Sequence, residues 1–292
     1  MNAKSILLYS DSHEGKTTQL YHLAKYLWET HQQKTRIITA DLGGYEVFND
    51  SQLVAKGIVD IADLTSSGIT YAHLMKLLSL GYWFVNGKIQ ETEKYRNFDN
   101  VGAYFFEGVT SLSERYLDYI RNEAQSPGFK ASWSFKDGDS EIKGLQEGHY
   151  GIVQQELYKW IRNTKSLPVK YVVWTSHQQE TKVKGKGTMI LPKAAGDAIN
   201  FRIPSWFSYV FHMDHQEVTD DNGLMKNKRY AWFQEHQDLN KEMIAPATIR
   251  LLPDIAAQWE ERYPKGRFLL THRKPLIHYL NEYFELAEKE TN

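Results

Sequence analysis

The sequence contains no cysteine in its 292 residues. Disulfide bonds and thiolate-ligated metals are therefore excluded, and a reducing compartment fits this composition best. Neither sign of charge is in excess, because 35 Lys and Arg residues face 36 Asp and Glu residues, so binding to nucleic acid would need a local basic patch. No apolar run approaches the ~20 residues of a membrane-spanning helix, and the sequence starts without a charged-then-apolar leader. We expect a cytoplasmic protein that has no membrane segment.

Motifs of several enzyme classes are missing as well. The eleven histidines form no HExxH pair and no His/Cys cluster, so the sequence predicts no zinc site. There is also no Gly-x-Ser-x-Gly nucleophile motif and no internal repeat. What is present is a chain of 41% hydrophobic residues, whose length suits one large α/β domain with additions.

Residues 5–22 predict a phosphate-binding loop. An apolar run at residues 6–9 is typical of a buried strand, and a helical period begins at residue 20. The N–H groups of such a loop face phosphate, its lysine reaches the outer phosphate oxygens, and the hydroxyl after the lysine suits Mg²⁺. The first glycine of the Gly-x-x-x-x-Gly-Lys-[Ser/Thr] pattern is replaced here by a serine, which lacks the freedom of glycine at positive φ. The alternative is a chance Gly-Lys-Thr before a helix. The loop residues are Ser10, Asp11, Ser12, His13, Glu14, Gly15, Lys16, Thr17 and Thr18.

Two further predicted strands end in carboxylates. Residues 36–41 end at Asp41, with Glu46 shortly after, and residues 103–107 end at Glu107. Because ligands of parallel sheets gather at the carboxyl ends of the strands, these acids are placed to face the phosphates. Glu107 stands where a Walker B carboxylate supports Mg²⁺ through water, and Asp41 or Glu46 would orient the attacking water. Capping of a turn or helix is the alternative for Asp41 and Glu107.

Another predicted strand, residues 170–177, ends in polar side chains. His177 and Gln178 are placed to sense the γ-phosphate, unless this strand end simply faces solvent. The basic stretch that follows predicts a mobile loop, which would meet nucleic acid or a neighbouring subunit's nucleotide, or remain in solvent. A hairpin formed by residues 207–216 and 226–233 carries a second basic group. The candidates for contacts with DNA or a second subunit are Lys182, Lys184, Lys186, Lys226, Lys228, Arg229 and Arg250.

The remaining pattern indicates how the chain is divided. An Asn-Gly pair predicts a β-hairpin insertion near residues 82–90. Residues 125–148, rich in Gly and polar residues, predict a second insertion with little structure. Helices are expected at residues 70–80, 113–124 and 151–164, and an amphipathic helix from residue 275 to about residue 289. We expect one domain over residues 1–255 and a helical C-terminal extension over residues 256–292.

Together these motifs resemble the RecA-like P-loop ATPase core. The run from Phe106 to Leu112 is similar to the family's Asp-Ser-hydrophobic-Thr-Ser/Ala-Leu, and Trp174-Thr175-Ser176-His177 is similar to its hydrophobic-Thr-Ala-His. The resemblance covers residues 1–255 and looks closest to nucleotide-binding proteins of bacteriophages, some of which act in single-strand annealing and recombination. It implies an α/β fold with a mostly parallel central sheet, flanking helices and a β-hairpin region toward its end. It also implies ATP with Mg²⁺, and a homo-oligomeric ring or filament that engages single-stranded DNA.

The leading functional hypothesis is therefore an ATPase that acts in DNA recombination, replication or repair. Its Lys16 and Thr17 would hold the phosphates and the metal, as in other phosphoryl-transfer sites. A small-molecule kinase with the same loop is one alternative, but it would need a lid with several arginines, and the candidate loop after residue 178 offers only lysines. A nucleotide-dependent DNA-packaging or assembly factor with little turnover is the other alternative.

Overall fold

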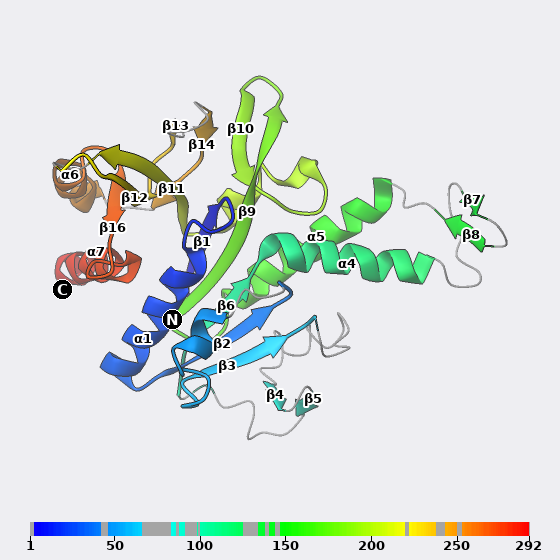
Figure 1. Ribbon diagram of the computed structural model, residues 1–292, viewed down its shortest axis with the longest axis horizontal. Helices are drawn as coiled ribbons and strands as arrows, with labels where there is room; N and C mark the ends of the chain where they lie inside the picture. Colours follow the sequence, from blue (N-terminus) through cyan, green and yellow to red (C-terminus); the bar gives the residue numbers. More distant parts are fainter. Residues whose placement is uncertain are drawn as a thin grey trace.

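Figure 1 shows the computed structural model of the chain. The structure describes residues 3–41, 46–65, 83–85, 88–90, 98, 100–124, 134–137, 140–143, 147–219, 222–237, 243–249 and 253–291. The elements within these ranges form a 12-stranded sheet, helices on both faces of that sheet, and two separate two-stranded hairpins. This is the mostly parallel α/β architecture with flanking helices that the sequence predicted.

Parallel strands form the centre of the sheet, in the order β3, β2, β6, β9, β1 and β11. Their bounds, in the same order, are Val59–Asp63, Lys34–Thr39, Val101–Glu107, Tyr171–Val183, Lys4–Ser10 and Tyr209–Thr219. β6 is buried along its whole length and β1 in all but its first residue, as their apolar runs predicted. Because these strands are parallel, their carboxyl ends meet at one edge of the sheet, where ligands of such sheets bind.

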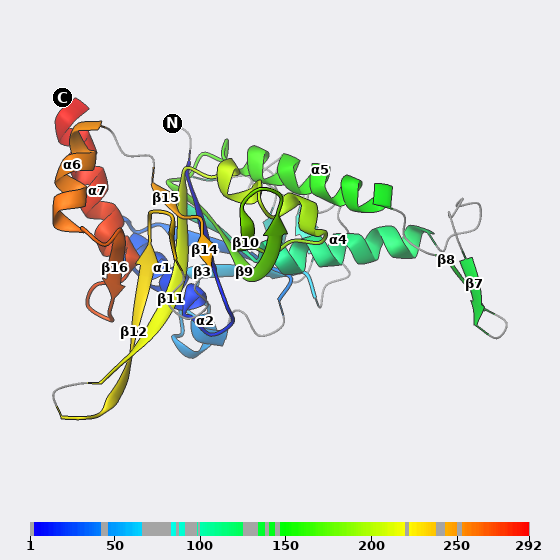
Figure 2. The same ribbon diagram turned by 90° about the horizontal axis from the view of Figure 1, so that it is seen from above.

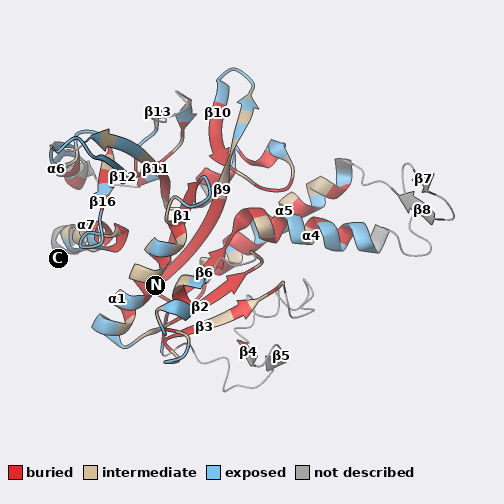
Figure 3. Cartoon of the chain, in the orientation of Figure 1, coloured by how far each residue is buried: buried red, intermediate tan, exposed pale blue. Residues whose placement is uncertain are grey.

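Helices cover the two faces of this sheet. α1 (Lys16–His31), α6 (Pro253–Arg262) and α7 (Leu276–Thr291) share one hydrophobic core, and α2 (Glu46–Asp50) adds Phe48 to it. α4 (Val109–Ala124) and α5 (Glu147–Thr164) contribute to a second core that includes Leu112 and Trp160. Figure 3 shows the buried strands between these layers. The apolar residues that α1 buries recur at the helical period that the sequence predicted, and they are Leu20, Leu23, Ala24 and Leu27.

Antiparallel hairpins extend the sheet beyond its parallel centre. β9 continues past its parallel part and turns back as β10 (Gly187–Pro192), which pairs with residues 178–183 of β9. The expectation of a mobile basic loop was therefore wrong, because most of this stretch is a hairpin. β11 turns back as β12 (Met225–Trp232), as predicted, and Figure 2 shows this hairpin extending away from the body of the molecule. The short strands at the margins are β13 (His236–Gln237), β14 (Ile244–Ala245) and β15 (Thr248–Ile249).

Both expected insertions contain paired strands. β4 (Trp83–Val85) pairs with β5 (Lys88–Gln90), as the Asn-Gly pair between them predicted. β7 (Ser134–Asp137) pairs with β8 (Ser140–Lys143), so the expectation of little structure over residues 125–148 was wrong for this part. The helix expected at residues 70–80 lies outside the described residues.

The C-terminal stretch contributes a strand as well as helices. The helix predicted from residue 275 is α7, but β16 (Arg267–Leu270) precedes it and pairs with β12 at the sheet edge. The Tyr279 hydroxyl of α7 donates to the Leu269 carbonyl at 2.7 Å, and the Leu276 N–H donates to the Gln19 side-chain oxygen of α1 at 2.8 Å. Within the described ranges, no helix combines the length and the apolar character needed to cross a membrane.

Candidate nucleotide-binding site

The loop between β1 and α1 has the geometry of a phosphate cradle. β1 ends at Ser10 and α1 begins at Lys16, so residues 11–15 form a loop at the carboxyl edge of the sheet. His13, at φ 66°, and Gly15, at φ 88°, supply its left-handed turns. Ser10 has no positive φ because it still belongs to β1, and this explains why a serine is accommodated where the motif has glycine. α1 directs the positive end of its dipole toward this loop.

Lys16 is folded back over the loop. Its Nζ donates to the Asp11 carbonyl oxygen at 2.7 Å, to Ser10 Oγ at 2.9 Å and to the Ser10 carbonyl oxygen at 3.2 Å. Burial lowers the pKa of this ammonium to about 8, although the neighbouring Glu107 carboxylate opposes the shift. Since all three partners are neutral oxygens, a charged phosphate oxygen would be a stronger acceptor for the same ammonium.

Glu107, the last residue of β6, contacts the start of α1. The Thr17 hydroxyl donates a hydrogen bond to Glu107 Oε1, while Glu107 Oε2 is buried without a hydrogen-bond partner among the described residues. Glu107 is only 4% exposed, and burial raises the pKa of its carboxyl group to about 7, against the effect of the Thr17 hydrogen bond. A hydroxyl beside a buried carboxylate with an unused oxygen is a set of donors that suits a hard cation such as Mg²⁺.

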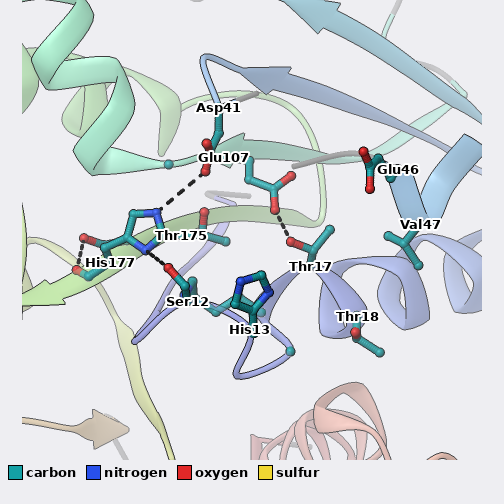
Figure 4. A pocket seen from close by; sticks show the side chains of 14 residues that line it. Ser12, His13, Thr17, Thr18, Asp41, Glu46, Val47, Glu107, Thr175 and His177 are labelled. Atoms are coloured by element: carbon teal, nitrogen blue, oxygen red, sulfur yellow. Dashed lines mark hydrogen bonds and ion pairs between the residues drawn. The ribbon is translucent and has the colours of Figure 1, made fainter. Parts of the chain in front are cut away.

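Asp41 and His177 meet at the same cavity. Asp41 follows β2, and its Oδ2 lies 3.7 Å from His177 Nε2. The interaction with His177 lowers the pKa of Asp41, so this carboxylate is ionised at neutral pH. His177 Nδ1 lies 3.4 Å from Ser12 Oγ, so His177 connects β9 to the phosphate loop (Figure 4). The sheet register explains this position, because His177 of β9 pairs with Ser10 at the end of β1.

These side chains line a cavity of about 490 Å³. Glu46, from the first turn of α2, also lines it, and Figure 4 shows its carboxylate on the same side as that of Glu107. Sequence reasoning missed Val47 and Gly108, which complete the wall. The structure explains the glycine, since a Cβ at residue 108 would lie 3.3 Å from the Thr175 carbonyl oxygen of β9, closer than most Cβ contacts.

Gln178 does not line this cavity. Its side-chain oxygen lies 2.7 Å from Nε2 of His212, a fully buried residue of β11. His212 Nδ1 in turn lies 3.0 Å from His236 Nε2, and the His236 ring stacks on Trp232. Side chains alternate along a strand, so His177 and Gln178 of β9 project to opposite faces. The structure therefore brings His177 to the cavity and places Gln178 in a buried histidine cluster.

We expect His236 to make the stability of the protein depend on pH. Burial lowers the pKa of His236 to about 4, from an ordinary value near 6.5. The neutral His236 ring therefore favours the folded state fully at pH values above its unfolded pKa. This stability is lost as the pH falls toward the folded pKa of His236, because the unfolded chain takes up the proton first. The loss amounts to roughly 3 kcal/mol. Urea unfolding of the wild type and of His236→Asn across this pH window measures it; the variant should lose less stability, and equal losses would contradict the prediction.

The predicted basic residues occupy separate places. Lys182 lies near the end of β9, and Lys184 and Lys186 lie in the turn before β10, where the Lys186 ammonium is 4.9 Å from the centre of the Phe201 ring. The second group, on β12, is exposed and consists of Lys226, Lys228 and Arg229. Of these three residues, only Arg229 is found against the phosphate loop. Arg250 lies outside the described residues.

A contact that sequence reasoning missed fastens the phosphate loop to β11. Glu14 Oε1 lies 2.7 Å from His215 Nδ1. The two residues are 201 positions apart, and no local pattern in the sequence predicts such a contact. The loop is thus held on both sides, by His177 from β9 and by His215 from β11.

The parallel sheet, and the strand, loop and helix around Lys16, are the features of a P-loop ATPase domain. The chain belongs to the AAA domain family, which its sequence matches over residues 2–240. It is also similar to the solved structure of a KaiC-like protein from the hyperthermophilic archaeon Pyrococcus horikoshii OT3, at 14% identity over 79% of each chain, with a TM-score of 0.44. No curated protein matches the sequence.

Proposed function

We propose that this protein hydrolyses ATP in a Mg²⁺-dependent reaction. The observation that supports this best is the pairing of Thr17 with Glu107 at a cavity that Lys16 also lines. A loop ammonium, a loop hydroxyl and a carboxylate at a strand end are the groups that phosphoryl transfer requires around a triphosphate. Thr17 and Glu107 are the residues that would hold Mg²⁺, and the bound ion would supply positive charge against the triphosphate.

The two central acids differ in their electrostatics and therefore in their proposed roles. Asp41, whose pKa is lowered, remains an acceptor at neutral pH and orients the attacking water, with Glu46 as the second candidate. His177 contacts Asp41 and Ser12 at once, and it belongs to the strand that continues into the β9–β10 hairpin. Loss of the γ-phosphate next to Asp41 would thus change the contacts of His177 and, through β9, the position of the hairpin beyond it.

We infer further that hydrolysis serves DNA recombination, replication or repair, in a bacteriophage-type protein acting in the cytoplasm of a bacterial host. The sequence resemblance supports this, and so does the position of Lys182, Lys184 and Lys186 on the hairpin directly beyond His177. Single-stranded DNA is the proposed partner, because lysines on an exposed hairpin neutralise phosphates without reading the sequence. Hydrolysis rates with and without single-stranded DNA test the proposal, which requires stimulation. Phosphate transferred to an added nucleoside would instead favour the kinase alternative.

Replacing Lys182, Lys184 and Lys186 together by alanine should weaken binding to single-stranded DNA and flatten its dependence on salt. Each lost phosphate contact removes about 0.7 from the slope of log Kobs against log salt, so the slope should fall by roughly 2. Fluorescence anisotropy of a labelled oligonucleotide across a salt series measures this slope. Alanine at Lys25, Lys56 and Lys265, which are exposed elsewhere, is the matched control. A triple variant with the wild-type slope would place the DNA on another surface.

A homo-oligomeric ring or filament is the proposed assembly. Lys226 and Lys228 are exposed on the β11–β12 hairpin, which extends away from the body of the molecule (Figure 2), and are the candidates for reaching a neighbouring subunit's nucleotide. Light scattering in the presence of ATP tests the assembly. A mass of one chain at every concentration at which ATP is hydrolysed would rule it out.

A further inference from the structure

One basic residue of β12 lies against the phosphate loop of its own chain. Arg229 Cδ is 3.7 Å, and its Nε 3.9 Å, from the point that a Cβ on Gly15 would occupy. The sheet fixes this approach, because β1 pairs with β11, β11 pairs with β12, and His215 is the partner of Arg229 in the register. His215 itself contacts Glu14 of the loop at 2.7 Å. The Arg229 side chain therefore reaches the loop from a strand that is paired on both sides, with His215 of β11 and Leu270 of β16.

The positive charges of β12 are divided between the two faces of the strand. Side chains alternate along a strand, so Lys226 and Lys228 share one face with Tyr230, whereas Arg229 shares the other face with Ala231. Ala231 is packed in the core that contains α1, and Tyr230 belongs to a separate small cluster with Trp232. Of this basic group, Arg229 alone is directed toward the side of the sheet from which α1 and the phosphate loop arise.

The Arg229 guanidinium is uncommitted within the described part of the chain. Two arginines that lie against the sheet do have partners: Arg36 donates to the Tyr104 hydroxyl at 2.7 Å, and Arg267 lies 3.8 Å from the centre of the Tyr230 ring. Arg229 makes no ion pair, side-chain hydrogen bond or ring contact with any described residue, and the nearby Glu14 carboxylate is engaged by His215. A guanidinium left unpaired beside a phosphate cradle retains its donors for an anionic ligand.

The direction of a bound nucleotide follows from the positions of the other groups. Glu107, Asp41 and His177 line one end of the cavity, where the γ-phosphate and metal belong in the proposed function. Figure 4 shows Thr18 on the opposite side, beyond Thr17. A nucleotide whose terminal phosphate faces the acids must leave the cradle on the side of Gly15 and Thr18. That is the side on which Arg229 lies, since Thr18 Cβ is also within 3.9 Å of the same point above Gly15.

We propose that Arg229 binds the α-phosphate of the nucleotide held by its own phosphate loop, as the second cation of the site beside Lys16. This inference rests on the proposed function, because it requires a nucleoside di- or triphosphate in the cradle. The fork of guanidinium donors suits two phosphate oxygens at once, which a lysine cannot match. Arg229 thereby belongs to the subunit's own site, whereas Lys226 and Lys228 remain candidates for contacts between subunits.

Isothermal titration with ADP in Mg²⁺ buffer tests the inference. Arg229→Ala should weaken ADP binding about tenfold, the size expected for a lost hydrogen bond to a charged group. Arg229→Lys should recover only part of this loss. Lys265→Ala, which removes one exposed charge from the turn before β16, should bind ADP as the wild type does. An equal loss of ADP affinity in Lys265→Ala would show that the effect of Arg229→Ala comes from the net charge of the protein, and it would overturn the proposal.

A phosphorus NMR spectrum of bound ADP separates direct contact from indirect effects. Arg229→Ala should shift the α-phosphorus resonance and leave the β-phosphorus resonance in place. If affinity and both resonances equal those of the wild type, Arg229 has no role at the nucleotide. In that case the proposed function still stands, provided that wild-type protein binds ADP and Lys16→Ala does not. Failure of the wild type itself to bind ADP would instead remove the proposed function.

Discussion

Lys16→Ala should lower ATP hydrolysis by roughly 100- to 1,000-fold, the effect of removing one preorganised donor from a site where charge develops. The Lys16 ammonium is held above the loop by three neutral oxygens of Ser10 and Asp11, at 2.7 to 3.2 Å. A triphosphate would replace these partners with charged oxygens, so the ammonium gains most when negative charge grows during transfer. No other described lysine or arginine lines the cavity, and Arg229 is proposed for the α-phosphate, so nothing replaces this charge at the outer phosphates.

The fold of Lys16→Ala should survive. Burial lowers the pKa of Lys16 to about 8, which means that the folded state disfavours the charged ammonium. Removing this ammonium should therefore cost little folding free energy. Phosphate release under steady-state conditions measures activity, and the thermal transition measures folding. Lys25→Ala, an exposed position on the same helix, controls for the loss of a positive charge. Wild-type turnover in a folded Lys16→Ala protein would refute the assignment of the site.

The centre of the site could be predicted because it depends on local rules. Buried apolar runs predict strands, and parallel strands bring their carboxyl ends together, so the sequence alone predicts Asp41 and Glu107 at one edge of the sheet. The Gly-Lys-Thr sequence between a strand and a helix predicted the position of Thr17 in the same way. The contact between Thr17 and Glu107 spans 90 positions, yet both ends follow from these rules.

The direction of single side chains was harder to predict. His177 and Gln178 are neighbours after the same apolar run, but only His177 lines the cavity. Predicting which one does so requires the phase of the strand, and the sequence indicated a strand end here, whereas β9 continues to Val183. The part of β9 after Gln178 is held by backbone pairing with β10 and needs no apolar side chains. Its polar sequence therefore does not show the hydrophobic pattern by which a strand is predicted.

Contacts that depend on the order of the strands in the sheet could not be predicted. The neighbours of the phosphate loop on its β11 side, His215 and Arg229, are placed by the pairing of β1 with β11 and of β11 with β12. Strand order is a property of the whole chain, so a basic run on a hairpin gives no indication of which charge turns inward. The sequence therefore grouped Arg229 with Lys226 and Lys228, and the alternation of side chains along β12 separates them.

Glu107→Gln should abolish most ATP hydrolysis and, at the same time, stabilise the nucleotide-free protein at alkaline pH. Burial raises the pKa of Glu107 to about 7, above the ordinary value of 4.5. A carboxyl group with a raised pKa favours the folded state fully below the unfolded pKa, and this benefit is lost as the pH rises through the folded pKa. Above that window the wild type therefore holds a buried charge at a cost of about 3 kcal/mol. Glutamine removes the charge and keeps an oxygen for the Thr17 hydroxyl.

The stability that Glu107→Gln gains at alkaline pH should be smaller than the full cost of burying the Glu107 charge. The glutamine N–H₂ group would replace Glu107 Oε2, which already lacks a partner, and an unpaired buried donor costs about 1–3 kcal/mol. We therefore expect the difference in unfolding free energy, variant minus wild type, to rise by about 3 kcal/mol between acid and alkaline pH, from a negative or zero value. Urea unfolding in EDTA, without nucleotide, measures this difference. Because the expectation concerns the slope with pH, a constant offset between the two proteins would contradict it.

Asp41→Asn is the matched control, because its electrostatics have the opposite sign. The pKa of Asp41 is lowered by its interaction with His177, so its ionised form stabilises the folded state above the unfolded pKa and that stability is lost in acid. The asparagine variant should therefore be less stable than the wild type at neutral pH, with the difference shrinking as the pH falls. Two neighbouring acids in one cavity would then show opposite stability profiles while both variants hydrolyse ATP poorly. That pattern would mean that the burial of Glu107 serves binding of the metal and triphosphate and destabilises the nucleotide-free protein. A purely structural role would instead make both substitutions destabilising.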